Sequence, residues 1–416
     1  MGVNGILNTD TPSLVLSLFD SSLSIIHPLK LLGITVYGVA NSMDDIGDVG
    51  RASNSIKLFR AQDPFQSPKP LLDCLLQIQS KAGRPVALFA PSDKMTLFMS
   101  SNRATLAEKF LFNLPDTSLV NSMYQKHSQL ELIAKTGMKV PRTVEFSAEL
   151  GFSREKLREL ELPVFIKPHN MQLWLPHFPV KGFAIETREK LERTLDEIET
   201  KHIDVVVQEY IPGPLENMCE VSGYVDTHGE LRGLITTVKT RIYPRDLGVG
   251  SYMHSTRNPE AEELAEKTIR AIGVRGFFNM ELKKHEVTGA FEYIETNLRP
   301  WQQISLAHAG GIPFIETAYR DLTGQSMPAF RHAESGKAWM DPVLDYYSII
   351  KDPALRIRDW LGWFLELWRA DEFAVFSWND LRPGWKKLRN GKELLGLAGE
   401  TFKFLKKSFR ASKMTK

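Results

Sequence analysis

The first quarter of the chain alternates short apolar runs with amphipathic stretches. The apolar runs, at residues 14–19, 34–39 and 85–90, have the length and composition of buried strands. The stretches between them, at about 22–32 and 69–82, carry apolar residues at helical spacing. Strands that alternate with helices in this way form a parallel sheet. The hydrophobic pattern therefore predicts an N-terminal α/β domain.

Polar residues follow two of these predicted strands. Asp20 and Ser21 come after the first strand, and Pro91-Ser92-Asp93 come after the third. In an open parallel sheet such positions line the crevice in which ligands bind. The glycine-rich dinucleotide fingerprint does not follow the first strand, so a nicotinamide site is not expected there. Asp93 is expected to cap the helix that follows it.

The middle of the chain predicts a second unit of mixed structure. A helix over about 122–136 ends at Gly137, and two more helices are expected at 187–200 and 259–273. Apolar, β-branched runs predict strands, and they lie at 163–168, 204–211, 218–226 and 231–239.

The most informative segment is a predicted β-hairpin near the end of this unit. Residues 277–283 and 291–299 are rich in Phe, Tyr and Ile, and a polar stretch ending at Gly289 joins them. Because successive strand side chains point to opposite faces, Glu295, Asn297 and Arg299 share one face. If the hairpin closes symmetrically around residues 287–289, Glu281 lies opposite Glu295.

Two carboxylates directly opposite each other repel and should destabilise the sheet. A hard cation between them removes that cost, and carboxylate and amide oxygens are ligands that Mg²⁺ accepts together with substrate phosphates. The hairpin thus predicts a metal site at Glu281, Glu295 and Asn297, with Mn²⁺ as a second possible ion. Arg299 would lie beside the phosphates as a fork of donors. Spacing alone leaves open a solvated hairpin face with a surface Glu–Arg pair.

The C-terminal part changes character. Residues 352–369 carry apolar side chains at helical spacing and predict an amphipathic helix. Residues 382–416 hold eleven Lys or Arg against two Glu, interleaved with Trp, Phe and Leu. This basic amphipathic tail fits a peripheral contact with an anionic membrane surface. It fits equally a helix packed on the core with a solvated basic face.

Composition narrows the class of protein. A chain of 416 residues with 43% hydrophobic and 25% charged residues is expected to fold into two or three domains with a real core. A net charge of +2 argues against nucleic acid as a partner. The two cysteines, Cys74 and Cys219, show neither a disulfide framework nor metal spacing, as expected of a cytoplasmic protein.

Taken in order, the middle unit resembles an ATP-grasp domain. Five elements carry the resemblance: Lys126 in a helix before Gly137-Met138-Lys139-Val140-Pro141, strand 163–168 with Lys167, segment 207–213, Glu281, and Glu295-Thr296-Asn297-Leu298-Arg299. The N-terminal parallel sheet is also a feature of that superfamily. Within it, the chain most resembles carboxylate–amine ligases of the D-aspartate ligase and carbamoyl-phosphate-synthetase-like group. Segment 241–250 resembles that group's loop at the acceptor site.

The resemblance implies an α/β fold of three parts. These are a Rossmann-like pre-ATP-grasp domain at 1–115, a two-lobed ATP-grasp domain at 116–330 and a helical, basic extension at 331–416.

The resemblance also assigns roles to individual residues. Lys126, Lys167 and Lys181 would hold ATP phosphates, Arg299 would neutralise the transferring phosphoryl group, and Glu216 would hold the ribose. Adenine would lie against the backbone of the hinge strand, which is Gln208, Glu209, Tyr210 and Ile211. Lys239 and Arg241 would bind phosphate or an acidic substrate, with strand-edge charges as the plain alternative.

The implied activity is an ADP-forming ligase that joins a carboxylate to an amine through an acyl phosphate, in a cytoplasmic protein for which a homodimer is one expected state. A carboxylase or carbamoylating enzyme that uses bicarbonate is a second hypothesis, although no biotin-bearing or glutaminase segment is present in this chain. A non-catalytic nucleotide-binding scaffold at a membrane surface is the third. The loop at 169–181 motivates it, because that loop holds two internal prolines and a Trp where many relatives are glycine-rich.

Overall fold

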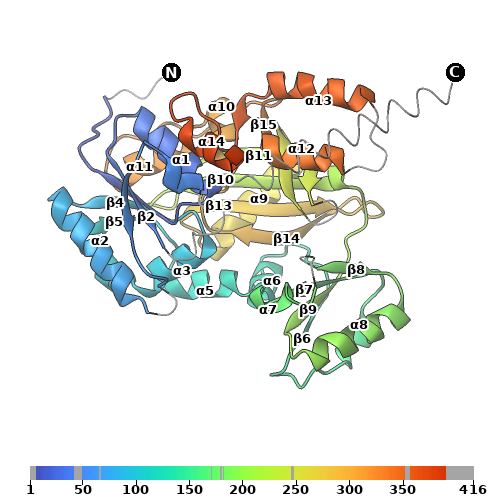
Figure 1. The fold of residues 1–416 in the computed structure, drawn as a ribbon. Coiled ribbons are helices and arrows are strands. Elements are labelled where there is room, and N and C mark those ends of the chain that lie inside the picture. The colour runs from blue at the N-terminus through green and yellow to red at the C-terminus, as the bar shows by residue number, and fades with distance from the viewer. Residues whose placement is uncertain are drawn as a thin grey trace.

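The computed structural model describes residues 6–41, 49–64, 67–169, 171–178, 180, 182–244, 248–351 and 357–389. Three sheets organise these residues, as Figure 1 shows. A parallel sheet forms the N-terminal domain, a large sheet lies at the centre, and a small sheet forms a separate lobe below it. This arrangement agrees with the α/β fold expected from the hydrophobic pattern.

The N-terminal sheet has five parallel strands in the order β3-β2-β1-β4-β5. Its strands are β1 (Ser13–Leu16), β2 (Val36–Ala40), β3 (Lys57–Arg60), β4 (Val86–Phe89) and β5 (Phe110–Leu111). Its helices are α1 (Asp20–Leu31), α2 (Lys69–Ala82), α3 (Asp93–Ser101) and α4 (Arg103–Ala107). The three predicted strands and two predicted helices are confirmed. β3 is largely exposed and β5 has two residues, so neither gave an apolar run in the sequence.

The order of the strands reverses at β1, which places the ends of β1 and β4 side by side. The side chain of Ser92 caps α3 by accepting a hydrogen bond of 3.4 Å from the Met95 N–H. The expectation that Asp93 is the cap was wrong, because Asp93 is already the first helical residue. Asp20 is likewise the first residue of α1.

The small lobe is an antiparallel sheet in the order β6-β9-β7-β8. Its strands are β6 (Thr143–Phe146), β7 (Val164–Pro168), β8 (Phe183–Ile185) and β9 (Val205–Glu209). Helix α8 (Arg188–Thr200) buries Leu191, Leu195 and Ile198 in the core of this lobe. The short helix α7 (Met171–Trp174) adds Trp174, which is fully buried in the same core.

The central sheet has seven strands in the order β14-β13-β10-β11-β12-β15-β16. They are β10 (Met218–Val225), β11 (Leu231–Tyr243), β12 (Val249–Thr256), β13 (Gly276–Lys284), β14 (Phe291–Asn297), β15 (Ala338–Met340) and β16 (Glu372–Phe373). Every neighbouring pair is antiparallel except β15 and β16. The predicted hairpin is β13 and β14. Helices α9 (Pro259–Ile272), α10 (Ile304–Ala309) and α11 (Phe314–Leu322) belong to this part of the chain.

The helix predicted over 122–136 is two helices, α5 (Thr117–Tyr124) and α6 (Lys126–Ala134). Gln125 separates them with an extended backbone, at φ −90° and ψ 117°. The apolar spacing continues through this corner, so the pattern concealed it. The break makes Lys126 the first residue of α6 rather than a residue inside a helix.

Three helices cover the top of the molecule in Figure 1: α12 (Pro342–Ile350), α13 (Ile357–Arg369) and α14 (Arg382–Arg389). The predicted amphipathic helix is confirmed by α13 over its described residues. β15 and β16 extend the central sheet, so this part of the chain is continuous with the sheet. The division into domains at 115 and 330 stays a prediction, and residues 390–416 of the predicted tail lie outside the described residues.

Candidate active site

A cleft of about 910 Å³ lies where the N-terminal domain, the small lobe and the central sheet meet. The N-terminal domain contributes Ser21 and Asp93, the small lobe contributes Lys167, and the central sheet contributes Glu281 and Glu295. Predicted site residues from all three parts of the chain therefore line one cavity. Its size suits a nucleotide with a small second substrate.

The hairpin has the predicted register. Glu281 of β13 lies opposite Glu295 of β14, and Asn279 lies opposite Asn297. A β-bulge follows, because Leu282 pairs with Tyr293 and leaves one extra residue on β14. Glu281, Glu295 and Asn297 all line the cleft, and Arg299 lines it just beyond the end of β14.

The two opposed carboxyl groups differ in their electrostatic surroundings. Burial raises the pKa of the Glu281 carboxyl to about 7, and the Lys239 ammonium group offsets only part of this effect. Burial also acts to raise the pKa of Glu295, but Lys167 and Lys126 hold it below its ordinary value. Glu295 therefore carries a full negative charge near neutral pH in a pocket of positive charge.

Glu220 is a carboxylate in this site that the sequence reasoning missed. It lies on β10 directly opposite Glu281, and its side chain is buried. Lys239 of β11 bridges the two groups, with Nζ 2.8 Å from Glu220 Oε1 and 3.1 Å from Glu281 Oε2. Burial lowers the pKa of Lys239, but the two carboxylates raise it further, so Lys239 stays charged. The position of Glu220 between Cys219 and Val221, inside a predicted strand, was the sequence feature that could have identified it.

Lys126 and Lys167 approach the carboxylates from the other side of the cleft. Lys167 lies on β7, and its Nζ donates a hydrogen bond of 3.2 Å to Gln208 Oε1. Burial lowers the pKa of Lys167, and Glu295 opposes this effect. Burial and the charge of Lys167 likewise lower the pKa of Lys126. Lys126 and Lys167 are two partly desolvated cations beside the Glu295 carboxylate, and such cations are suited to hold a polyphosphate.

The hinge strand β9 uses its side chains for structure. Gln208 Nε2 donates to Thr143 Oγ1 at 2.9 Å, and Glu209 Oε1 accepts from the Glu161 N–H at 2.8 Å. The Tyr210 hydroxyl accepts from Lys283 Nζ at 3.3 Å. Gln208, Glu209, Tyr210 and Ile211 all line the cleft. The backbone of this segment is therefore next to the cavity, as the predicted adenine contact requires.

Arg299 has a partner from the N-terminal domain. Its Nε donates to Asp93 Oδ1 at 3.0 Å, and both side chains line the cleft. Asp93 was expected to line the crevice, but its pairing with Arg299 joins residues 206 positions apart and had no sequence signal. Asp20 was also expected there. Its carboxylate instead accepts from Lys387 Nζ of α14 at 2.7 Å, and the cleft is lined by its neighbours Phe19 and Ser21.

Two predicted residues, Arg241 and Glu216, do not line the cavity. The Arg241 guanidinium pairs instead with Asp345 and Glu366, each at 2.7 Å, and its catalytic role stays a prediction. The register of β11 against β12 shifts between Lys239 and Arg241, and this bulge breaks the alternation that would put both on one face. Glu216 is exposed and off the cleft lining. Lys181 lies outside the described residues.

The donor set fits a hard divalent cation. Two carboxylates and one amide oxygen converge from Glu281, Glu295 and Asn297, and Mg²⁺ completes such a set with water and substrate phosphates. Among the described residues, no group of three or more His, Cys, Asp and Glu side chains is arranged to hold a metal by itself.

The chain is similar in sequence and in fold to known ligases. No family model matches the chain. Over 331 residues the chain is 25% identical to a D-aspartate ligase of Enterococcus faecium (strain Aus0004), covering 70% of this chain and 78% of that protein. Its fold is similar to an L-amino acid ligase from Bacillus licheniformis, with a TM-score of 0.57, 14% identity and coverage of 76% and 75%.

A second solved structure of similar fold is N5-carboxyaminoimidazole synthetase from Staphylococcus aureus. The TM-score is 0.58, with 14% identity and coverage of 80% of this chain and 82% of that one. The same enzyme has also been solved with ADP. The predicted ATP-grasp fold and the predicted resemblance to carboxylate–amine ligases are confirmed by this set of relatives.

Proposed function

We propose that the cleft binds MgATP and that this chain is an ADP-forming ligase, which joins a carboxylate to an amine through an acyl phosphate. The observation that carries the proposal is the buried pair Glu281 and Glu295, opposed on β13 and β14 within reach of the charges of Lys126 and Lys167. The resemblance to D-aspartate ligase supports the same chemistry.

The residues of the cleft would divide the work of binding. Lys126 and Lys167 would neutralise the phosphates of ATP, and the backbone of residues 208–211 would hold the adenine. Glu281, Glu295 and Asn297 would hold one or two Mg²⁺, which offset the phosphate charge when bound. Arg299, fixed by Asp93, would neutralise the transferring phosphoryl group.

The proposed reaction has two steps. A substrate carboxylate oxygen attacks the γ-phosphorus, the bond to the β-phosphate oxygen breaks, and ADP leaves. The amine nitrogen then attacks the acyl carbon, inorganic phosphate leaves with the bonding electrons, and the nitrogen loses a proton. Positioning and charge neutralisation supply most of the rate in such a transfer. No protein nucleophile is needed for these steps. The acid and the amine would meet in the part of the cleft lined by Glu281 and Arg299.

Calorimetry of MgATP binding tests the nucleotide site. Wild type is expected to bind MgATP, and Glu295→Gln is expected to bind at least about tenfold more weakly, because a charged ligand to the cation is lost. Glu286→Gln, an exposed change in the turn of the same hairpin, is the matched control and should bind as wild type. Equal binding by Glu295→Gln would contradict the proposed metal site.

ADP release tests the ligase chemistry. It should depend on both a carboxylic acid and an amine when a panel of amino acids and small amines is supplied. Release that needs bicarbonate instead would favour a carboxylating enzyme. MgATP binding without phosphoryl transfer to any acid would leave only nucleotide binding and overturn the ligase proposal.

Location and assembly are further parts of the proposal. Within the described residues, no helix is long and apolar enough to cross a membrane. We propose a cytoplasmic enzyme with a peripheral membrane contact through its C-terminal part. A homodimer was also expected from the sequence, and sedimentation would measure it directly.

A further inference from the structure

Helix α13 presents its apolar side to solvent. Leu361, Phe364, Leu365 and Trp368 are each at least half exposed, and Trp368 is 86% exposed. Their spacing of three, four and seven residues puts them on one helical stripe. A stripe of this kind normally faces a protein core. We call these four residues the α13 face.

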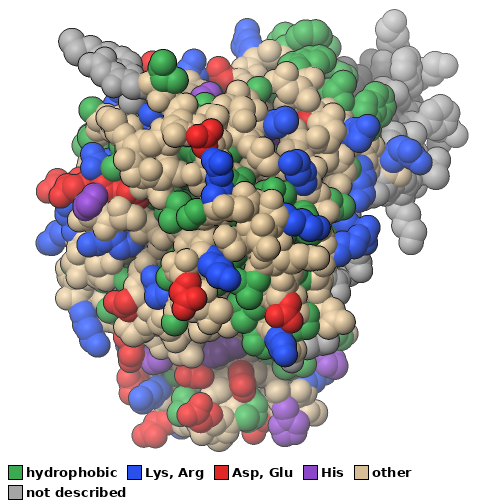
Figure 2. Space-filling model, turned by 90° about the vertical axis from the view of Figure 1, so that its left-hand side faces the viewer, with side chains coloured by type: hydrophobic (Ala, Val, Ile, Leu, Met, Phe, Trp, Pro, Cys, Tyr) green, Lys and Arg blue, Asp and Glu red, His purple; other side chains and the backbone are tan. Residues whose placement is uncertain are grey.

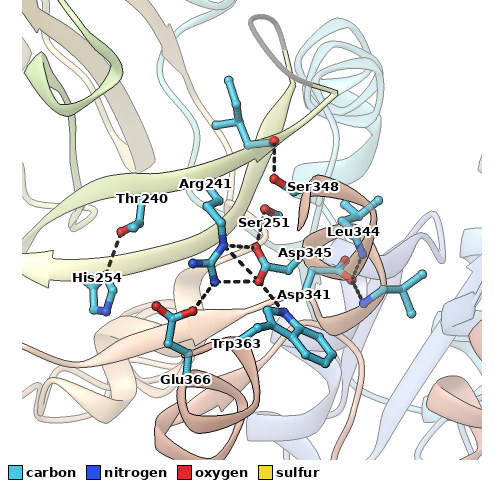
Figure 3. A network of polar contacts seen from close by, with 12 residues as sticks. Thr240, Arg241, Ser251, His254, Asp341, Leu344, Asp345, Ser348, Trp363 and Glu366 are labelled. Carbon is cyan, nitrogen blue, oxygen red and sulfur yellow. Dashed lines mark hydrogen bonds and ion pairs between the residues drawn. The ribbon is translucent and has the colours of Figure 1, made fainter. Parts of the chain in front are cut away.

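Two polar groups of α13, on Trp363 and Glu366, point the other way, into the protein, as Figure 3 shows. Trp363 Nε1 donates to Asp345 Oδ2 at 2.9 Å, and Glu366 Oε2 lies 2.7 Å from Arg241. Asp345 is fully buried and also accepts from Arg241 at 2.7 Å and from Ser251 Oγ at 2.7 Å. This network ties α13 to α12 and β11 in one orientation, so the α13 face cannot turn inward without breaking it.

A second exposed aromatic segment follows α13. Trp378 is 93% exposed, and Leu381 and Trp385 are also exposed on and just before α14. Lys387 fixes this helix, because its Nζ donates to Asp20 and to Asp341 at 2.7 Å each. Both helices lie at the top of the molecule in Figure 1. In Figure 2, hydrophobic side chains gather at that upper edge, with Lys and Arg side chains on the surface below them.

The exposed charged side chains at the ends of these helices are mostly basic, although Asp371 is also exposed. Arg369, at the end of α13, and Arg382 and Arg389, on α14, are all exposed. In the sequence, residues 382–416 hold eleven Lys or Arg and two Glu. Exposed Trp, Phe and Leu flanked by basic side chains match an interface that enters the headgroup region of an anionic bilayer. A second copy of the chain would instead bring two basic surfaces together.

We propose that the α13 face docks on the surface of an anionic lipid bilayer, with Arg369, Arg382 and Arg389 among the basic groups that meet the lipid headgroups. The apolar side chains supply the partitioning, and the basic ones supply the preference for anionic lipid. The small lobe lies at the opposite end of the molecule in Figure 1, away from the proposed docking surface. This inference rests on the peripheral membrane contact proposed above and assigns it to the α13 face, but it does not depend on the ligase activity.

Vesicle flotation of the full-length protein tests the proposal. Wild type is expected to bind phosphatidylcholine vesicles that contain phosphatidylglycerol, and to bind pure phosphatidylcholine vesicles less. The double variant Phe364→Glu, Trp368→Glu should bind at least about tenfold more weakly, because two apolar anchors become charges that anionic lipid repels. Raising the salt concentration should weaken wild-type binding, since the basic contribution is screened.

Leu150→Glu combined with Val287→Glu is the matched control, because these two side chains are also exposed but lie in turns far from α13 in the sequence. It adds the same charge and should bind vesicles as wild type does. Circular dichroism and MgATP calorimetry on both double variants establish that each is folded. They also separate a failure of docking from a failure of the proposed function, since docking is measured without ATP.

Three results would overturn the proposal. One is a wild-type protein that does not float with anionic vesicles. Another is equal flotation of wild type and the α13 double variant, with binding lost only when residues 390–416 are removed. The third is a wild-type dimer in sedimentation that the α13 double variant converts to a monomer, because a second copy would then cover the α13 face.

Discussion

At the scale of single residues, the site depends on how buried charges are compensated. Glu295, Glu281 and Glu220 stand in one row across three neighbouring strands. Lys239 is shared between two of them, at 2.8 Å from Glu220 and 3.1 Å from Glu281. Like charges on directly opposed positions destabilise a sheet. The Lys239 ammonium group therefore offsets the repulsion between Glu220 on β10 and Glu281 on β13.

Replacing Lys239 tests this compensation. Lys239→Met should lower the free energy of unfolding without added metal by about 3 kcal/mol, because it leaves buried carboxylates without their partner. Adding Glu220→Gln should recover part of the loss. Urea unfolding measures both. Lys284→Met removes a surface pair at 3.5 Å and should change stability by less than about 1 kcal/mol. A similar small loss for Lys239→Met would contradict the shared role.

At the scale of elements, short edge pieces complete the central sheet. β16 holds two residues and pairs with β15, which places Glu372 beside Trp339. Burial raises the pKa of Glu372 from 4.5 to about 7, and the charge of Asp371 adds to this. The edge of the sheet therefore binds a proton that the unfolded chain releases at lower pH.

This proton gives β16 a pH-dependent stability. Because the folded-state pKa is raised, the contribution is fully present below about pH 4.5 and is lost as the pH rises to about 7. Glu372→Gln should reduce this slope, leaving the share of Glu281, and should raise the melting temperature at pH 8 relative to wild type. Thermal unfolding at a series of pH values from about 5 to 8 measures how the melting temperature depends on pH. Glu263→Gln, an exposed change on α9, should leave the wild-type slope intact.

At the scale of the whole molecule, the end of the described chain closes onto its beginning. Lys387 of α14 binds Asp20, the first residue of α1, and Asp341, which caps α12. Asp380 accepts from Ser53 at 2.5 Å and lies 3.5 Å from His27. These buried contacts fasten the C-terminal helices to the N-terminal domain.

Lys387→Met should loosen that attachment. It leaves the Asp20 and Asp341 carboxylates without their shared cation, at an expected cost of about 3 kcal/mol in the free energy of unfolding. Limited proteolysis should then cut near α14 sooner than in wild type, while Lys351→Met, on an exposed residue after α12, should be cut at the wild-type rate. Equal cutting of all three proteins would contradict a fastening role for Lys387.

Local sequence patterns were enough for the features set within one hairpin or one strand. The alternation along residues 291–299 predicted that Glu295, Asn297 and Arg299 come together, and all three line the cleft. The short turn predicted that Glu281 meets Glu295. The parallel N-terminal sheet followed from its apolar runs. Each of these depends on residues that are near one another in the chain.

Features that depend on distant pairing or on an irregular backbone could not be predicted. Glu220 faces Glu281 only because β10 inserts between β13 and β11. The bulge beside Thr240 turns Arg241 away from the cleft. The residue types of β11 do not indicate that a bulge forms there. The corner at Gln125 is likewise invisible in an apolar pattern that runs through it.

The order of strands in the central sheet sets the distance between its hairpin edge and the strands near α13. β14 and β15 are separated by five strand spacings, and at about 4.8 Å each this is roughly 24 Å. The carboxylates lie at the first end, whereas α13 packs near β12 and β15 through Leu367. If the α13 face docks on a bilayer as proposed, Glu295 and its neighbours lie several strands away from the docked helix. The width of the central sheet would then hold the phosphate end of the cleft away from the lipid surface.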